Sequence, residues 1–329
     1  MPQVSEAPAL AGPDTAERLD AHRRPLLGLC YRMLGSPFEA EDAVQETMLR
    51  AWRGMGQFDG RAELSTWLYR IATNVCLDML KGRQRRAVPM DLGPAQAPII
   101  DNLRTRPKAT WIEPIPGGAL AEPDPADAVV AGESIRLAFV AALQLLPPKQ
   151  RAVLILCEVL RWQASEVAEL LGLSIPSVNS ALQRARATLE ARSVGRDGAD
   201  RDARVADPEM LRRYVDAFQR YDLDALTALI HVDATQSMPP YDMWIDSRDG
   251  IFAWWYGPGI SCRGSRLRPA GTANGSPAFG QYKPNADGSY EPWALQVIEV
   301  SDERVAQFTF FLDTARLFPL FGLPPRLES

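Results

Sequence analysis

The chain has 329 residues, enough for two or three domains, and its 46% hydrophobic content allows buried cores. Its net charge of −5 argues against a protein that coats nucleic acid indiscriminately, although basic and acidic residues cluster locally. The four cysteines are scattered and the two histidines isolated, so we expect no disulfide, metal site or cofactor. No apolar run is long enough to span a membrane, and we expect a cytoplasmic protein.

The first predicted domain is helical and covers residues 14–86, after a disordered Pro/Ala-rich tail at 1–13. A helix is expected over about 15–34. Ser36-Pro37-Phe38-Glu39 is a capping box with proline at the first helical position, and it opens a helix that runs to about Trp52. One face of that helix is polar and either is simply solvated or docks a protein. Its residues are Glu41, Asp42, Gln45, Glu46 and Arg50.

A further helix with a basic tail is predicted from the string STWLYRIATNVCLDMLKGRQRR, which has a buried apolar stripe. The side opposite that stripe and the basic tail together carry Trp67, Arg70, Asn74, Lys81 and Arg83. This combination suits unstacked bases, because a ring can stack, an amide can read a base edge and cations can hold phosphates. A lone tryptophan is also common in a protein core, so the pattern alone does not decide between the two.

Residues 87–132 are rich in proline and are predicted to be a linker, with Trp111 as an anchoring point. A second helical domain is predicted at 133–193. Its last two helices, QASEVAELLGLSIPSVNSALQRARATL, have serine caps and a glycine turn, as in a helix-turn-helix. The exposed face of the second of these helices carries Ser177, Asn179, Ser180, Gln183 and Arg184. The alternative is an ordinary helical hairpin with a solvated polar face.

Beyond a charged linker at 194–206, residues 207–329 are predicted to form an α+β domain. Helices are expected over about 207–221, 224–230 and 248–256, and strands over about 262–272, 278–282, 293–300 and 305–312. Aromatic residues supply either a pocket or simply the core of a small sheet: Trp244, Trp254, Trp255, Tyr256, Phe279, Tyr282 and Trp293. Asp242 and Asp246 are candidate polar groups. With His231 they form no recognisable catalytic constellation, so no enzyme activity is expected.

Three strings in this order resemble the extracytoplasmic-function (ECF) sigma factors of the sigma-70 family. They are EAEDAVQETMLRAW, FDG followed by STWLYRIATNVCLDMLKGRQRR, and LPPKQRAVLILCEVL followed by the helix-turn-helix. The resemblance covers about 20–86 (region 2) and 133–193 (region 4). The residues from 207 on resemble a SnoaL-like domain of the nuclear-transport-factor fold. The implied architecture is a multidomain chain with two all-α regions followed by an α+β cone.

The resemblance implies partners and roles. The polar face of the 37–52 helix would dock on the β′ clamp helices of RNA polymerase core, and region 4 on its β flap. The loop at 58–65 and the helix after it would melt and read the minus-ten promoter element, with Asn74 at the base-reading position. The helix-turn-helix would read the minus-thirty-five element. Asn179 and Ala181 replace basic residues common in the family, which predicts a weak phosphate grip there.

The C-terminal domain is predicted to regulate activity in cis by packing on the sigma core or on the 87–132 linker. A small-molecule ligand of this domain and a separate anti-sigma factor are further candidate partners. Two other functions stay open: a one-component helix-turn-helix regulator with a ligand-sensing domain, and an enzyme fused to a DNA-binding module. Neither explains why region 2 is present.

Overall fold

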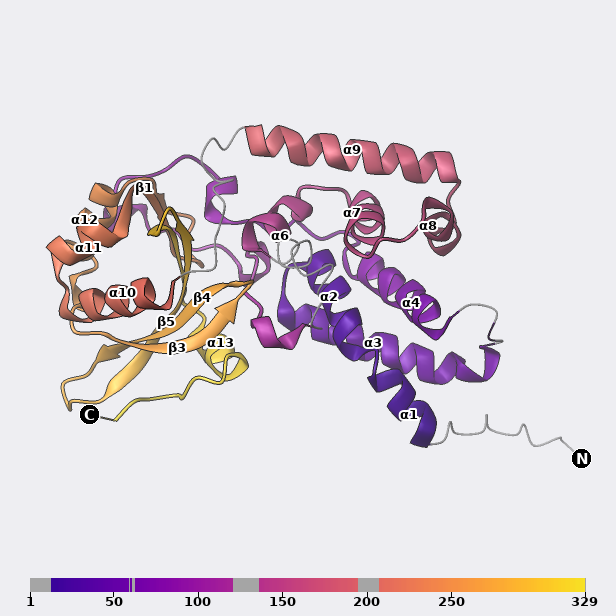
Figure 1. The fold of residues 1–329 in the computed structure, drawn as a ribbon, viewed down its shortest axis with the longest axis horizontal. Coiled ribbons are helices and arrows are strands. Elements are labelled where there is room, and N and C mark those ends of the chain that lie inside the picture. The colour runs from indigo at the N-terminus through magenta and orange to yellow at the C-terminus, as the bar shows by residue number, and fades with distance from the viewer. Residues whose placement is uncertain (1–12, 59, 61–62, 121–135, 195–206, 329) are drawn as a thin grey trace, which may run out of the picture. The chain divides into compact units, whose positions relative to one another are not determined.

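The computed structural model describes residues 13–58, 60, 63–120, 136–194 and 207–328. The chain divides into two compact units (Figure 1). The helical unit comprises 1–85, 119–134 and 142–191, and the C-terminal unit comprises 86–118, 135–141 and 192–329. Most of the predicted tail at 1–13 and of the linker at 194–206, and the second part of the 87–132 linker, lie outside the described residues.

The first part of the helical unit consists of α1 (Pro13–Asp20), α2 (Arg23–Leu34), α3 (Pro37–Gly54) and α4 (Leu64–Met79), with α2, α3 and α4 in mutual contact. The single helix expected over 15–34 is two helices, with a turn at 21–22. Gly35 ends α2 in the left-handed region at φ 71°, where glycine has no Cβ to clash. The predicted cap of α3 is confirmed, because Ser36 Oγ accepts a hydrogen bond from the Glu39 amide at 3.4 Å.

The second part of the helical unit consists of α6 (Leu137–Gln144), α7 (Pro148–Leu154), a π turn (Ile155–Val159), α8 (Ala164–Leu171) and α9 (Ile175–Val194), of which α6 is shared with the other unit. Gln163, rather than Ser165, stands at the cap of α8, and Glu166 completes its capping box. Gly172 follows at φ 63°, as the turn between the two helices requires. The pair α8–α9 is therefore a helix-turn-helix, held by Val167, Leu170, Val178 and Ala181 in one apolar cluster.

The C-terminal unit is a curved six-stranded sheet with helices on its faces (Figure 1). Its elements are α10 (Pro208–Arg220), α11 (Leu223–Leu229), β1 (Ile230–Ser237), β2 (Trp244–Ile245), α12 (Arg248–Tyr256), β3 (Arg266–Ala273), β4 (Ser276–Pro284), β5 (Tyr290–Ser301), β6 (Arg304–Phe311) and α13 (Thr314–Leu320). The strand order is β2-β1-β6-β5-β4-β3, and only the β1–β6 pair of this sheet is parallel.

The core of this unit lies between the sheet and α10–α12, where Tyr214, Phe218 and Phe308 pack together. Tyr282 points to the other face and packs edge-on against Phe318 of α13 at 5.1 Å between centroids. The four strands expected from the sequence correspond to β3–β6. Strand β1 was not predicted, because it begins directly at the end of α11 and its pattern does not alternate cleanly.

Residues 86–118 belong to the C-terminal unit although they precede it by about a hundred residues in the chain. They contain short 3₁₀ turns at Pro89–Asp91, Ile100–Asn102 and Lys108–Thr110, and they continue into a fourth at Gly117–Ala119. Trp111, Ile112 and Ile115 are buried. The first part of the predicted linker therefore packs as part of a folded domain, and residues 86–118 are called the bound linker below.

Candidate functional site

The outer face of α3 carries the five residues predicted to dock a protein: Glu41, Asp42, Gln45, Glu46 and Arg50. Glu41 accepts a hydrogen bond from Arg23 at 2.6 Å, and Glu46 accepts one from Arg50 at 2.7 Å. All four of these side chains are more than a third exposed, so the pairs contribute little to stability and can be replaced by pairs with a partner.

Leu49 lies among these polar residues and was not singled out from the sequence. Its side chain is 52% exposed on α3. A large apolar side chain surrounded by charges is typical of the centre of a protein interface, where it becomes buried and the charges form the rim. An apolar residue within an otherwise polar helix face is the signal that could have revealed it.

The predicted base-reading face of α4 is partly open. Trp67 is half-buried and tilts against Phe58, with 5.2 Å between ring centroids. Gly54 makes room for this ring, since a Cβ there would lie 3.1 Å from Trp67 Cζ2. Asn74 is exposed about two helical turns further along α4. The aromatic ring and the amide are thus both held on a rigid helix rather than on a loop.

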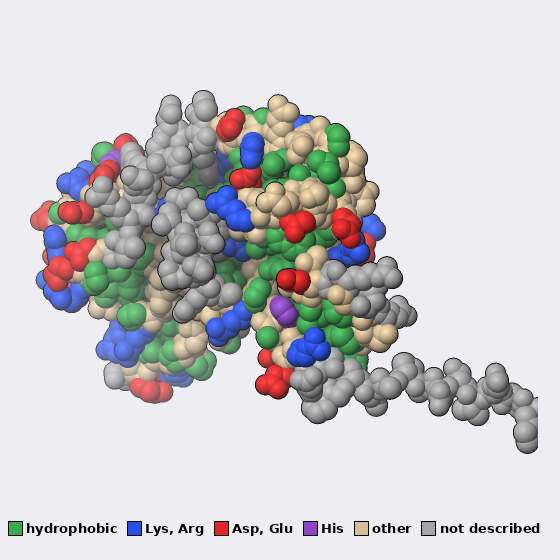
Figure 2. All heavy atoms as spheres, turned by 45° about the vertical axis from the view of Figure 1, so that its right-hand side comes forward, with side chains coloured by type: hydrophobic (Ala, Val, Ile, Leu, Met, Phe, Trp, Pro, Cys, Tyr) green, Lys and Arg blue, Asp and Glu red, His purple; other side chains and the backbone are tan. Residues whose placement is uncertain are grey.

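Three predicted phosphate-binding cations have intramolecular acceptors. Arg70 donates to the backbone oxygen of Glu169 at 3.0 Å, Lys81 to Asp78 at 2.7 Å and Arg83 to Glu39 at 2.8 Å. The bond from Lys81 lowers the pKa of the Asp78 carboxyl. Exposed pairs of this kind are weak, so a DNA phosphate can replace the acceptor. Acidic and basic side chains are intermixed over the face drawn in Figure 2.

The outward face of α9 presents the predicted recognition residues. Ser177, Asn179, Ser180, Gln183 and Arg184 are all exposed. Ser177 also shares a 2.8 Å hydrogen bond with Ser174, the residue at the start of the helix. Ala181 differs from them, because it is buried in the helix-turn-helix core. An alanine at position 181 therefore does not cost a phosphate contact, and only Asn179 supports the predicted weak phosphate binding.

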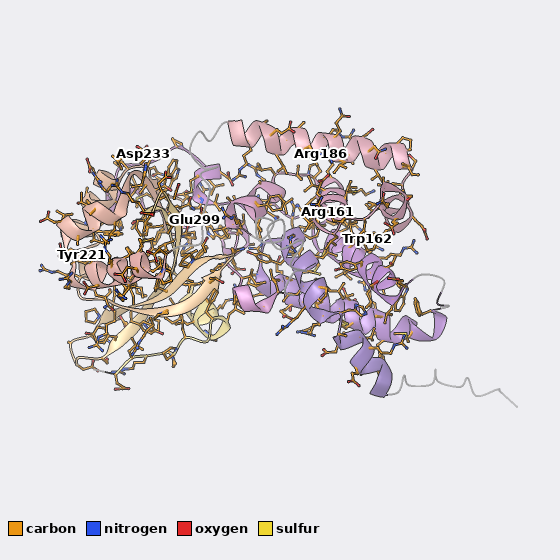
Figure 3. All side chains as sticks on the ribbon, in the orientation of Figure 1. Arg161, Trp162, Arg186, Tyr221, Asp233 and Glu299 are labelled. Carbon is orange, nitrogen blue, oxygen red and sulfur yellow. The ribbon has the colours of Figure 1, made fainter. Side chains whose placement is uncertain are left out.

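Within the helical unit, helix α4, predicted to read bases, also touches the helix-turn-helix. Tyr69 packs edge-on against Trp162 at 5.5 Å between centroids, beside the Arg70–Glu169 contact. Trp162 lies in the turn before α8 with Arg161, whose φ of 59° is unusual for a residue with a side chain (Figure 3). Arg70 is therefore engaged by α8 in this arrangement, and binding of DNA there would replace that contact.

Arg151 of α7 is a second link between the two halves of this unit. It is buried and donates to the backbone oxygens of Met33, Gln144 and Leu146 and to the Gln144 side chain. Burial lowers its pKa to about 10. Because one guanidinium satisfies four acceptors, removing it would leave several buried oxygens without a donor. Nothing in the local sequence pattern distinguishes this arginine from an exposed one.

The bound linker forms a ladder of hydrogen bonds with the C-terminal unit around β2. The Gln96 amide donates to the Trp244 backbone oxygen, and Trp244 Nε1 donates to the Gly93 oxygen, both at 2.9 Å. Further along, the Asp242 amide donates to Arg104 O at 3.0 Å, and Arg106 Nε donates to the Asp242 carboxylate at 2.9 Å. Trp244 and Asp242, proposed from the sequence as pocket groups, thus hold the linker.

Two further contacts hold the end of the bound linker. Ile115 and Asn274 exchange two hydrogen bonds, from the Ile115 amide to Asn274 Oδ1 at 3.1 Å and from the Asn274 amide to Ile115 O at 3.0 Å. Glu113 accepts from Arg316 of α13 at 2.8 Å. Each contact joins residues more than 150 positions apart in the chain, so no local pattern could have revealed it.

An apolar cavity of about 190 Å³ lies inside the C-terminal unit. Three of the aromatic residues proposed from the sequence line it, namely Trp254, Trp255 and Trp293. The four others lie elsewhere. Trp244 of β2 donates to the bound linker, Tyr256 is exposed at the end of α12, Phe279 is in the core, and Tyr282 packs against Phe318 on the opposite face of the sheet.

Neither a carboxylate nor an imidazole is among the described residues that line this cavity. Asp246 is exposed, and His231 Nδ1 accepts a hydrogen bond from the Asp233 amide at 3.1 Å. The described residues contain no cluster of three His, Cys, Asp or Glu side chains arranged to hold a metal ion. In the same part of the chain, none of the helices has the length and hydropathy to cross a membrane.

Comparison with known proteins identifies the family. Residues 19–86 match the family described as Sigma-70 region 2, and residues 136–189 match Sigma-70, region 4. The ECF RNA polymerase sigma factor SigG of Mycobacterium tuberculosis (strain H37Rv) is 44% identical over 319 residues, which is 95% of this chain and 85% of that protein. The chain belongs to the ECF sigma factors. It therefore directs promoter-specific initiation of transcription.

Two other comparisons agree with this assignment. SigW of Bacillus subtilis (strain 168), also an ECF RNA polymerase sigma factor, is 33% identical over 174 residues, covering 53% of this chain and 86% of that one. The crystal structure of M. tuberculosis SigJ superposes with a TM-score of 0.60 at 24% identity, over 94% of this chain and 99% of that one, and shows a shared fold. This sigma factor thus has regions 2 and 4 followed by an α+β domain, as its sequence predicts.

Proposed function

We propose that this sigma factor acts in the cytoplasm as a non-enzymatic specificity subunit of RNA polymerase, and that its C-terminal unit regulates it in cis through the linker between regions 2 and 4. The observation that carries the regulatory part is the ladder that attaches residues 86–118 to the C-terminal unit. Acid–base catalysis has no support from the cavity, whose described lining holds no carboxylate or imidazole.

The roles of the individual surfaces follow from their chemistry. The acidic face of α3, with Leu49 in it, suits a basic coiled coil such as the β′ clamp helices. Trp67 and Asn74 would stack on and read unpaired minus-ten bases, while Arg70, Lys81 and Arg83 hold phosphates. The exposed face of α9 would enter the major groove at the minus-thirty-five element, with region 4 resting on the β flap.

The linker matters because its length sets how far apart the two promoter readers can move. Two elements about 25 base pairs apart are separated by roughly 85 Å along B-DNA, at about 3.4 Å per base pair. A chain spans at most about 3.6 Å per residue. When 86–118 is bound, only about 18 residues, 119–136, remain between the bound linker and region 4, and they reach at most roughly 65 Å beyond the end of the bound linker. Release of the bound linker would remove this restriction.

Run-off transcription with core polymerase tests the proposal, on a promoter mapped by sequencing transcripts after overexpression. Deletion of 207–329 is expected to change the rate or affinity of promoter-specific initiation, and an unchanged rate and affinity would contradict regulation in cis. Asn74→Ala is expected to weaken open-complex formation, whereas Asn285→Ala, in the turn between β4 and β5 of the C-terminal unit, is not. Site-specific DNA binding without polymerase, and no run-off product, would instead favour a one-component regulator.

A further inference from the structure

The cavity of the C-terminal unit is closed on one side by the bound linker. Ile100 and Leu103, on either side of the 3₁₀ turn at Ile100–Asn102, line it together with residues of β1, β4 and α12. Ile100 is 62% exposed, although it belongs to the wall of an apolar cavity. The linker side chains thus form a lid that touches whatever occupies the space, and this lid has apolar surface still available for contact.

Aromatic rings supply much of the remaining lining. Phe218, Trp254 and Trp255 line the cavity, and Trp255 packs edge-on against Phe218 at 5.4 Å between centroids. Trp293 also lines it, with Lys283 Nζ 3.2 Å from its ring centroid. Tyr221, at the end of α10 (Figure 3), also lines the cavity, and its hydroxyl donates to Trp255 O at 2.9 Å. Its pKa is raised by burial, so it stays neutral.

No charged side chain is among the described residues that line the cavity. Lys283, behind the wall, is already engaged by Ser261 Oγ at 3.1 Å and by the Trp293 ring. A charged ligand would therefore lose its hydration without gaining a free counter-charge, whereas a neutral one would not. An apolar cavity of about 150 Å³ is large enough for benzene. At about 190 Å³, this one has room for a substituted phenol or an indole-sized molecule.

Among the described residues of the wall, Gln281 has a buried oxygen without a hydrogen-bond donor. Gln281 is 1% exposed, and its Nε2 donates to Ser265 Oγ at 3.1 Å. Its Oε1 accepts no hydrogen bond from the described residues. Gln236, also in the wall, already uses its oxygen to accept from Trp255 Nε1 at 2.7 Å. A buried carbonyl without a donor is costly in free energy, and a ligand that supplies an N–H or O–H removes that cost.

We propose that this cavity binds a neutral, flat aromatic molecule of phenol or indole size, which donates one hydrogen bond to Gln281 and packs under Ile100 and Leu103. Because the linker forms part of the site, ligand binding and linker attachment stabilise each other, and the coupling is reciprocal. The regulatory consequence rests on the proposed function. The binding site itself does not, and it can be tested without polymerase.

Calorimetric titration of the full chain with three probes tests the site: indole, 1-methylindole, which lacks the donor, and indole-3-carboxylate, which carries a charge. Indole is expected to bind, 1-methylindole to bind about tenfold more weakly, and the carboxylate to give no measurable binding. Gln281→Met keeps the shape of the wall and is expected to abolish the difference between indole and 1-methylindole. Absence of indole binding, or equal affinity for indole and its methyl derivative in the unchanged chain, overturns the proposal.

A matched pair of linker variants tests the coupling. Ile100→Ser is expected to weaken indole binding about fivefold, whereas Ile99→Ser, at an exposed neighbour that does not line the cavity, is expected to leave it unchanged. Indole should also slow hydrogen exchange of the Gln96 and Arg106 amides, which bond to the C-terminal unit. Equal effects of the two variants, or unchanged exchange, overturn the coupling. If indole binds as expected but deletion of 207–329 leaves transcription unchanged, the proposed regulation fails and the ligand site stands.

Discussion

Replacing Glu113 by glutamine is expected to loosen the bound linker. The Glu113 carboxylate accepts from Arg316 at 2.8 Å and lies 3.9 Å from Arg86, whose guanidinium also donates to the Trp111 oxygen. The side chains of Glu113 and Arg86 are about 10% exposed, at 11% and 8%, while that of Arg316 is 37% exposed. Glutamine keeps the shape and one oxygen acceptor but removes the charge that compensates the two cations.

The size of the effect follows from these exposures. Breaking a fully buried ion pair costs about 3–5 kcal/mol, but the exposed Arg316 regains water and the amide oxygen still accepts a hydrogen bond. We therefore expect a loss of about 2 kcal/mol, which is roughly a 30-fold increase in the population of released linker at 1.4 kcal/mol per factor of ten. The linker should open more readily while the sheet stays folded, because Glu113 lies outside it.

Hydrogen exchange of the full chain, followed by mass spectrometry, measures this opening. Peptides that cover 108–118 should exchange about 30-fold faster in Glu113→Gln, whereas β4 and β5 should be unaffected. Glu291→Gln is the matched control, since Glu291 is exposed on β5. A change below about threefold in the linker peptides, with the far-ultraviolet spectrum intact, would refute the claim that this pair holds the linker.

Three more outcomes are expected. Asn179→Lys places a cation on the exposed face of α9, so the plot of log affinity against log salt for holoenzyme on promoter DNA should steepen by about one; an unchanged slope would place position 179 away from the phosphates. Arg151→Met leaves buried oxygens without a donor and should lower the free energy of unfolding by about 2–4 kcal/mol in denaturant titrations, whereas Lys149→Met on the same helix should not. Burial raises the pKa of Tyr282 to about 12, so the stability that the neutral phenol contributes is present below pH 10 and is lost between pH 10 and 12. Tyr282→Phe should therefore make thermal stability less pH-dependent in that window. Identical pH profiles of the two proteins would contradict the assignment.

Local signals in the sequence were enough to predict α3, α8 and α9 and the polar faces of α3 and α9. Ser36 with Glu39 and the glycine at 172 determine where helices begin and end, because caps and left-handed turns act over a few residues. The outward face of α9 follows from helical periodicity in the same way. A boundary differs from the prediction where two capping signals compete, as at α8, where Gln163 stands at the cap predicted for Ser165.

By itself, the sequence determined the order of the domains, the helix-turn-helix, the acidic face of α3 and the family. Only the tertiary structure decided what the linker does. Glu113 meets Arg316 across 203 residues, and Arg106 meets Asp242 across 136. Such contacts depend on how whole elements pack. A proline-rich segment has the same sequence pattern whether it binds a domain surface or remains a free linker. For the same reason, the place of Gln281 in the cavity wall could not be predicted, because in the sequence it is an ordinary strand residue.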